Sequence, residues 1–554
     1  MSGKRHSAEL AGPLLWVAPT LVTLVAGCYG VGRAQLWRDE LATWSASTRP
    51  AGDLLRLTGT VDASTGPYYL LMHAWTGLFG DSLPALRLPS ALAMAGAAGL
   101  TAVLGRRLFG TPAGLLAGLL FAVLPGTSRY AQEARPYAMV TLFAVLATVL
   151  LVRALDHPGW LRWSGYAVAV AGLGLAHLLA LSLLAAHAVV VLVAWALGRP
   201  AAGLARPPNG SAANPPADGP SGDEPATGQP AATGATTTTP STDRRDRRLL
   251  RWALAGLAAV VALTPLLVTA QGQRSHQLDW VAPARPADLA ALPGGLAQSG
   301  VVGGLLVGLA ALGAARSGRR GLLPGVCALL PVLLLFVAAL AVPLWVPRYL
   351  FFTVPFGCLL AGAALAGPPA TAARTGVGPV PVGAVGAGLA VVVLAGLLGM
   401  PDQLAVRQSH GWPRSATVDY RGAAAVIAAG QRPGDAVVYS PRDGWLFLDL
   451  GIDYQLARVA NDPPADGPAA ATHPRDVLVT RDRRDRADLW VSECPRPAEC
   501  LAGVDRVWLV VAGRHDDPLA AVPGVKGDAL RAGFTADQVR PRPGVTVALL
   551  VRRG

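Results

Sequence analysis

Long apolar segments recur along this chain, and they restrict the folds it can adopt more than any other feature. About eleven of them have the length that crosses a bilayer as a helix, roughly 20 residues. The chain is 52% hydrophobic and 15% charged, unlike a soluble protein. We therefore predict a polytopic α-helical membrane protein, with helices near residues 10–32, 83–104, 112–127, 136–153, 164–180, 182–198, 249–270, 297–314, 321–343, 348–366 and 377–400.

Basic residues between the apolar runs indicate the orientation, because short loops rich in lysine and arginine stay in the cytoplasm. The clusters that fall on one side are Lys4-Arg5, Arg106-Arg107, Arg153 with Arg162, and Arg316 with Arg319-Arg320. The opposite side, outside the plasma membrane, then holds the first loop (33–82), the loops 128–136 and 271–298, and the C-terminal region. The two runs before Pro200 are alternatively one long helix, which would reverse the later loops. The net charge of +13 therefore reflects topology, and no nucleic-acid-binding motif accompanies it.

Two segments depart from this apolar pattern. Residues 201–248, which interrupt a membrane domain over 1–400, are rich in Pro, Ala, Gly and Thr and predict a disordered cytoplasmic loop. Residues 401–554 carry frequent charges and short apolar strands at 436–439, 506–511 and 545–551, which predict a soluble extracytoplasmic α/β domain. In this domain Cys494 and Cys500 form either a disulfide, if the compartment is oxidising, or two free thiols.

An adjacent acid pair, Asp39-Glu40, lies just past the first apolar run, at the expected membrane surface. A carboxylate in this position can act as a general base towards a hydrophilic substrate while a lipid-borne partner lies in the membrane. The alternative is that the pair caps the following helix, since acidic residues favour first turns. The local sequence leaves both interpretations open.

A series of motifs follows the acid pair in a fixed order. They are Pro67-Tyr68-Tyr69, "LFGDS" over 78–82, "LRLPS" over 86–90, "SRYAQEARPYAM" over 128–139, "PRYLFF" from Pro347, and "DYRGAAAVIAAG" from Asp419. In this order the chain resembles the integral membrane glycosyltransferases of the GT-C class, and most of all glycosyltransferase family 39 with its bacterial protein-mannosyltransferase-like branch. The resemblance covers the membrane half closely and the C-terminal domain loosely.

This resemblance implies an inverting glycosyltransferase. It would move a mannose- or arabinose-like sugar from a polyprenyl-phosphate carrier to an acceptor outside the cytoplasm, either a protein, a lipid or a glycan. Asp39 is then expected to be the catalytic base, with Glu40 as its partner. An inverting transfer also needs positive charge or hydrogen-bond donors around the leaving phosphate, on the opposite face of the sugar.

Candidates for binding the substrates lie in the expected outer loops and at the start of a late helix. They are Arg348, Tyr349, Arg135, Tyr137, Glu133, Arg129, Tyr69 and His73. Arginine and tyrosine side chains can donate hydrogen bonds to a phosphate. The alternatives are that the arginines reach lipid headgroups, that Glu133 forms a structural ion pair, and that His73 packs in the core. His177 and the charged outer loop with Arg274, His276 and Asp279 are weaker candidates.

The remaining motifs limit the cofactors and leave two rival functions. No D-x-D pattern or second acid cluster predicts a metal site, although a divalent cation stays open because some GT-C relatives use one. No glycine-rich phosphate loop supports a nucleotide sugar. A transporter or flippase for lipid or sugar would also explain many helices, but it predicts inverted repeats with broken helices. A non-catalytic GT-C-like scaffold is the third possibility, and the intact acid pair argues against it.

Overall fold

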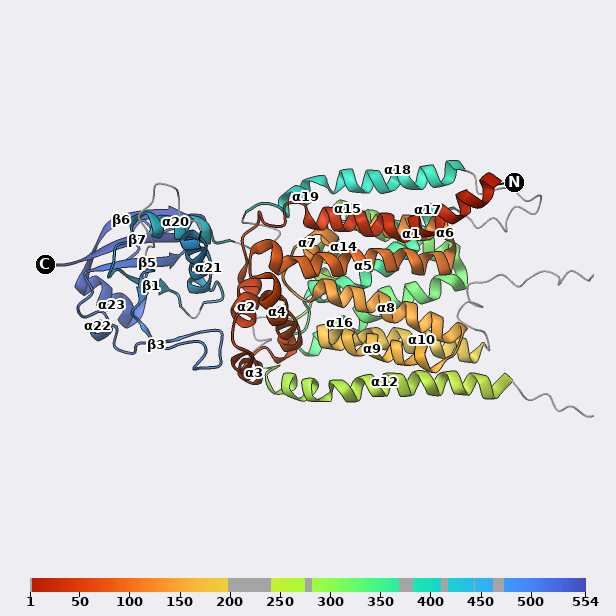
Figure 1. The fold of residues 1–554 in the computed structure, drawn as a ribbon, viewed down its shortest axis with the longest axis horizontal. Coiled ribbons are helices and arrows are strands. Elements are labelled where there is room, and N and C mark those ends of the chain that lie inside the picture. Colours follow the sequence, from red (N-terminus) through yellow and green to blue (C-terminus); the bar gives the residue numbers. More distant parts are fainter. Residues whose placement is uncertain are drawn as a thin grey trace, which may run out of the picture.

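The protein consists of a bundle of long helices with a small sheet domain at one end, and a layer of short helices lies between them (Figure 1). A computed structural model describes residues 2–197, 241–274, 281–367, 382–409, 417–442, 444–461 and 473–554. This arrangement agrees with the predicted fold class, a polytopic helical membrane part followed by an α/β domain.

The bundle helices coincide with the predicted apolar runs. They are α1 (Ser2–Cys28), α5 (Leu83–Phe109), α6 (Thr111–Val123), α8 (Tyr137–Asp156), α9 (Trp160–Ala176), α10 (Leu183–Ala196), α12 (Ser241–Gly272), α15 (Gly300–Ser317), α16 (Leu322–Ala341), α17 (Val354–Leu365) and α18 (Val382–Leu398). Shorter elements among them are α7 (Pro125–Ala131), α14 (Pro286–Ala297), η2 (Leu178–Ser182), η3 (Gly318–Gly321) and η4 (Pro347–Thr353). By length and composition, the described part of the chain has six membrane-crossing segments, or seven if the bent pair α6–α7 is one span. The run Gly300–Ala339, with α15 and α16, counts as one of the six.

Two details of the predicted membrane part are decided here. The backbone at His177 is extended and ends α9, so the runs before Pro200 form two helices instead of one. The expected disordered loop, 201–248, lies for the most part outside the described residues. Its end, from Ser241, is instead helical and begins α12.

The arginines used to assign topology gather at the end of the bundle away from the sheet domain. Arg107, near the end of α5, pairs there with Asp156, the last residue of α8, at 2.5 Å. The turn η3, with Arg319 and Arg320, lies at this end too, because α16 begins beside η3 and ends near the sheet domain. The first loop and the arginine-rich turns therefore occupy opposite ends of the bundle, as predicted.

The first loop is itself mostly helical. It forms α2 (Arg38–Ser47), α3 (Ala51–Thr60), η1 (Ala63–Thr65) and α4 (Gly66–Phe79), which lie across the end of the bundle (Figure 1). Apolar side chains of these helices, such as Leu41 and Leu54, share one hydrophobic core with Tyr420 and Ile427 of the sheet domain. The layer thus joins the two larger parts of the protein.

The C-terminal domain contains a five-stranded sheet in the order β2-β1-β5-β7-β6. β1 (Ala436–Ser440) pairs in parallel with β2 (Arg475–Asp476) and β5 (Arg506–Ala512), whereas β7 (Val545–Arg552) is antiparallel to β5 and to β6 (Phe534–Arg542). β3 (Val479–Arg481) and β4 (Ser492–Glu493) form a separate hairpin. The helices of this domain are α20 (Tyr420–Gly430), α21 (Leu448–Asn461), α22 (Pro497–Cys500) and α23 (Gly524–Gly533), whereas α19 (Met400–Ala405) follows α18 at the end of the bundle. The three predicted strands coincide with β1, β5 and β7, and Cys494 and Cys500 form a disulfide.

Glycines allow some bundle helices to approach very closely. Where α5 crosses α6, a Cβ atom on Gly105 would lie 2.7 Å from the Cα of Gly114 and 3.1 Å from a Leu359 methyl group. Backbone atoms cannot move aside without separating the helices, and small residues are the usual means of packing membrane helices.

We expect Gly105→Ala to destabilise the protein by roughly 1–3 kcal/mol, because the added methyl group overpacks the α5–α6 crossing. The control is Gly308→Ala in α15, where no atom lies within 4 Å of the added methyl group and the higher helix propensity of alanine is the main effect. Thermal unfolding of the two purified variants in detergent measures the difference. Equal midpoints would show that the crossing is not tightly packed.

Candidate active site

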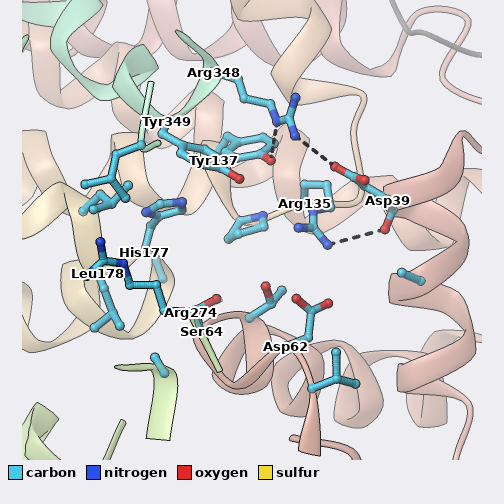
Figure 2. Close-up of a pocket in the computed structure, with 18 of the residues that line it drawn as sticks. Asp39, Asp62, Ser64, Arg135, Tyr137, His177, Leu178, Arg274, Arg348 and Tyr349 are labelled. Atoms are coloured by element: carbon cyan, nitrogen blue, oxygen red, sulfur yellow. Dashed lines mark hydrogen bonds and ion pairs between the residues drawn. The ribbon is translucent and has the colours of Figure 1, made fainter. Parts of the chain in front are cut away.

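A cavity of about 710 Å³ lies where the bundle, the first loop and the sheet domain meet. Its polar lining includes Arg38, Asp39, Asp62, Ser64, Arg135, Tyr137, His177, Arg274, Arg348 and Tyr349. Apart from Arg38, which it does not label, Figure 2 shows these side chains converging on one open space from several elements. The volume is typical of small-molecule sites.

Glu40 anchors the wall that carries Asp39. Its carboxylate accepts hydrogen bonds from Arg87 Nε at 2.8 Å, Arg87 Nη2 at 2.7 Å and the Ala134 N–H at 2.9 Å. It also accepts the N–H of Trp37 at 3.4 Å, so it caps α2. Both charged side chains are fully buried, and Arg87 donates further to the carbonyls of residues 31, 34 and 35.

This environment changes the expectation for Glu40, which was a catalytic partner of Asp39. Its carboxylate does not line the cavity, and its oxygens are occupied by Arg87 and the backbone. The helix-capping interpretation therefore holds for Glu40, which positions Asp39 and does not contact the reacting atoms.

Asp39, in contrast, points into the cavity. One carboxylate oxygen lies 3.0 Å from Arg38 Nε, and the other lies 3.6 Å from Arg348 Nη2. Its backbone carbonyl accepts hydrogen bonds from Thr43 Oγ1 at 3.1 Å and Arg135 Nη1 at 3.5 Å. Burial tends to raise the pKa of Asp39, but the charges of the three surrounding arginines outweigh burial and hold its pKa below the ordinary value. The carboxylate is therefore ionised at neutral pH.

Arg348 lies between Asp39 and two tyrosines at the membrane side of the cavity. Its Nε donates to Tyr137 Oη at 3.0 Å, and its guanidinium lies 5.4 Å from the ring centroid of Tyr349. The ring of His177 packs against Tyr349, with centroids 4.4 Å apart. The predicted residues Arg348, Tyr137 and Tyr349 thus form one cluster of hydrogen-bond donors (Figure 2).

Arg135 forms a second positive point on the same wall. Its Nη1 lies 3.4 Å from Tyr69 Oη, and Tyr69 donates to Asp62 Oδ2 at 2.5 Å. Burial and the nearby Asp62 charge raise the pKa of Tyr69 well above its usual value, so the phenol keeps its proton. Tyr69 does not line the cavity but supports Arg135 and Asp62, which do.

Three other predicted substrate-binding residues lie outside the cavity lining. Arg129 donates from Nη1 to Gln298 Oε1 at 3.0 Å and lies 3.8 Å from Glu133, as in the ion-pair alternative. His73 is in hydrogen-bond contact with the Ser47 carbonyl at 2.9 Å, which agrees with a packed histidine. Arg129 and His73 contact neighbouring elements instead of the cavity, and a role of these three residues in substrate binding stays a prediction.

Several cavity residues were not predicted as site residues. Asp62, just before the Pro-Tyr-Tyr motif, has a left-handed backbone (φ 60°). This conformation is uncommon, and no pattern in the sequence predicts it. Trp445, Phe447, Leu489 and Trp490 come from the sheet domain, and their position depends on how that domain docks. Arg274 lines the cavity, whereas His276 and Asp279 fall outside the described residues.

Both cavity carboxylates already have partners in the protein. In the part of the chain that the structure describes, no group of three or more His, Cys, Asp or Glu side chains is placed to hold a metal ion. Asp39 faces arginines and Asp62 accepts from Tyr69. This donor set does not fit a divalent cation, and the chemistry below is derived without one.

Comparison with known proteins agrees with the motifs. Residues 67–202 match the family of dolichyl-phosphate-mannose-protein mannosyltransferases. A search of curated proteins finds no match.

Solved structures share the fold along almost the whole chain. ArnT from Cupriavidus metallidurans in the apo state is 15% identical, with a TM-score of 0.57, and the likeness covers 98% of each chain. The same protein bound to undecaprenyl phosphate is 14% identical, with a TM-score of 0.56, covering 97% of this chain and 98% of that one. The chain therefore has the GT-C fold that its motifs implied.

We expect Glu40→Gln to destabilise the protein by about 3–5 kcal/mol, because it leaves the buried Arg87 charge without its counterion. A matched control is Asp53→Asn in the same loop, which removes an ion pair with the largely exposed Arg56 and should change stability by at most about 1 kcal/mol. Chemical unfolding of both variants measures the contrast. Similar losses would mean that the buried pair does not anchor α2.

Proposed function

We propose that this protein is an inverting glycosyltransferase of the GT-C class, which transfers a sugar from a polyprenyl-phosphate carrier to an acceptor hydroxyl. The observation that carries the proposal is the position of the Asp39 carboxylate. It lines an open cavity and lies beside Arg348, which contacts Tyr137 and Tyr349. The match to protein mannosyltransferases and the fold shared with a protein solved with undecaprenyl phosphate support a lipid-linked donor. We infer a mannose- or arabinose-like donor sugar from the motifs.

In this proposal the donor phosphate binds on the bundle side of the cavity. Arg348 and Arg135 supply positive charge, and Tyr137 and Tyr349 supply phenol groups. Apolar residues at the ends of bundle elements also line the cavity, among them Leu178, Leu267 and Leu344. A polyprenyl chain can lie against this apolar part while its phosphate reaches the arginines.

Asp39 acts as the general base. It takes the proton of the acceptor hydroxyl as the acceptor oxygen bonds to the anomeric carbon, and the bond from that carbon to the phosphate oxygen breaks on the opposite face. The electron pair of that bond stays on the leaving phosphate, whose growing charge the arginines stabilise. The result is a glycoside of inverted configuration and a free polyprenyl phosphate.

The arginines couple donor binding to the strength of the base. Without a donor they hold the pKa of Asp39 below its usual value. A bound phosphate brings negative charge to Arg348 and Arg135, offsets their effect on Asp39 and raises its pKa. Asp39 thus becomes a better base when the sugar is in place.

We also propose that the cavity and the sheet domain lie outside the plasma membrane. The arginine-rich turns at the far end of the bundle mark the cytoplasmic side by the positive-inside rule. The Cys494–Cys500 disulfide in the sheet domain fits an oxidising compartment.

We expect Asp39→Asn to lower sugar transfer by about 10²–10⁴-fold, because the amide cannot accept the proton. Undecaprenyl phosphate should bind at least as tightly as to the wild type, since a negative charge beside Arg348 is removed. The assay offers labelled polyprenyl-phosphate sugars and cell-envelope acceptors to protein in vesicles, with Asp53→Asn as the control of unchanged activity.

Retention of wild-type transfer by Asp39→Asn would exclude Asp39 as the base. Lipid translocation by the wild type without any transfer to accessible acceptors would support the flippase alternative. If the wild type binds the donor but shows no translocation and no transfer, the scaffold alternative would be supported.

We expect the acidic limb of the pH–rate profile of sugar transfer to depend on the charges around Asp39. Since the pKa of Asp39 lies below the ordinary value of about 3.9, kcat/KM for the donor should not fall through loss of the base between pH 7 and about pH 5. Arg38→Gln removes one of the charges that lower the pKa of Asp39 and should move the acidic limb to higher pH.

In the wild type the acidic limb of kcat should lie at higher pH than that of kcat/KM, because the bound phosphate raises the pKa of Asp39. If the acidic limbs of wild-type kcat/KM, wild-type kcat and Arg38→Gln kcat/KM coincided, the proposed effect of neighbouring charges on the pKa of Asp39 would be wrong.

A further inference from the structure

We propose that the sheet domain provides an aromatic subsite for a sugar ring of the acceptor, so that the acceptor is a saccharide and not a polypeptide. The inference rests on the proposed glycosyltransferase function and names the acceptor class of the same cavity. It comes from residues of the sheet domain that line the same cavity as Asp39.

The aromatic residues lie on two loops of that domain. Trp445 and Phe447 follow β1, and Trp490 lies in the connection between β3 and β4. All three line the cavity together with Arg38 and Asp39. They lie about 400 residues from the acid pair in sequence, and only the docking of the two domains brings them together.

The geometry places an aromatic surface next to the base. The rings of Phe447 and Trp490 stack with centroids 5.0 Å apart and planes 27° apart. The guanidinium of Arg38 lies 5.3 Å from the Trp445 ring, and its Nε lies 3.0 Å from Asp39. Aromatic faces, a cation and the base are therefore neighbours on one side of the cavity.

Two features set these residues apart from ordinary packing. Trp445 leaves 52% of its surface exposed, although indole rings are usually well covered. Phe447 is only 6% exposed and has a φ of 51°, which is a strained backbone conformation for a bulky residue. Strain of this kind persists where the surroundings hold a side chain in a required place, and it concentrates at ligand sites.

The chemistry of this surface suits a sugar ring. A pyranose or furanose has an apolar face of C–H groups that packs on an aromatic ring, and an edge of hydroxyl groups that a guanidinium and a carboxylate can bind. The donor phosphate occupies the opposite, bundle side of Asp39, and inversion requires the acceptor to approach from the face away from the leaving group. The cavity volume of about 710 Å³ has room for more than the donor sugar.

The subsite is held in place by contacts between the domains. Arg49, between α2 and α3, donates to the Asp488 carbonyl at 2.7 Å, in the same β3–β4 connection as Trp490. Arg458 of α21 donates to the Asp81 carbonyl of the first loop at 2.6 Å. The aromatic surface is thus pre-formed relative to Asp39, which reduces the ordering cost of binding an acceptor.

The test measures acceptor binding directly, with full-length protein in nanodiscs. Saturation-transfer NMR would use methyl α-D-mannopyranoside and methyl α-D-arabinofuranoside as saccharide probes, and a serine-containing hexapeptide as the polypeptide probe. We expect at least one glycoside to bind the wild type and to bind Trp445→Ala at least about tenfold more weakly. Trp445→Phe, which keeps a ring, and Trp160→Ala, which removes an exposed indole at the far end of the bundle, should bind as the wild type does.

Binding of the hexapeptide alone, binding of neither glycoside, or equal glycoside binding by Trp445→Ala would overturn the inference. Undecaprenyl phosphate binding, measured on the same samples, separates this result from the proposed function. If the wild type binds that lipid and transfers sugar while glycoside binding ignores Trp445, only the acceptor inference fails. If the wild type does not bind the lipid, the proposed function fails whatever the glycosides do.

Discussion

The buried ion pair between Glu40 and Arg87 fixes the part of the protein on which its chemistry depends. Isolated charges in an interior are expensive, and this pair is tolerated because the backbone and the two partners satisfy one another's hydrogen bonds. It ties the start of α2 to α5 and to the segment before Arg135. Since adjacent helical residues point about 100° apart, holding Glu40 inward turns Asp39 towards the cavity. The acid pair thus contains one buried anchor and one carboxylate that lines the cavity.

The sequence predicted the bundle and part of the site for physical reasons. Spanning length identifies membrane helices, and residues that end those helices next to outer loops, such as Tyr137 and Arg348, must lie at the membrane surface where a lipid phosphate is. The sequence does not say in which direction a loop side chain points, so Arg129, Glu133 and His73 were expected at the substrate and lie in other contacts. Trp445 and Trp490 were not foreseen, because no local pattern encodes the docking of two domains.

In the proposed mechanism, the electrostatics around Asp39 connect the donor and the acceptor. Three arginines beside one carboxylate make a site that is positive without a donor and less positive once a donor phosphate binds. Such a site attracts the lipid phosphate and keeps the base weak until the phosphate arrives. A base that is weak in the free enzyme abstracts a proton poorly from water or from an acceptor that has entered without a donor.

In the proposed function, the cavity walls also divide substrate recognition between the two domains. The arginines and tyrosines on the bundle side come from helix ends whose positions are set by packing in the membrane. The aromatic side comes from loops at the end of β1 and between β3 and β4, which can change in sequence without disturbing the sheet. A protein built in this way can keep one donor chemistry while its acceptor changes. The hydrophobic core shared by the first loop and the sheet domain fixes the position of the aromatic side relative to Asp39.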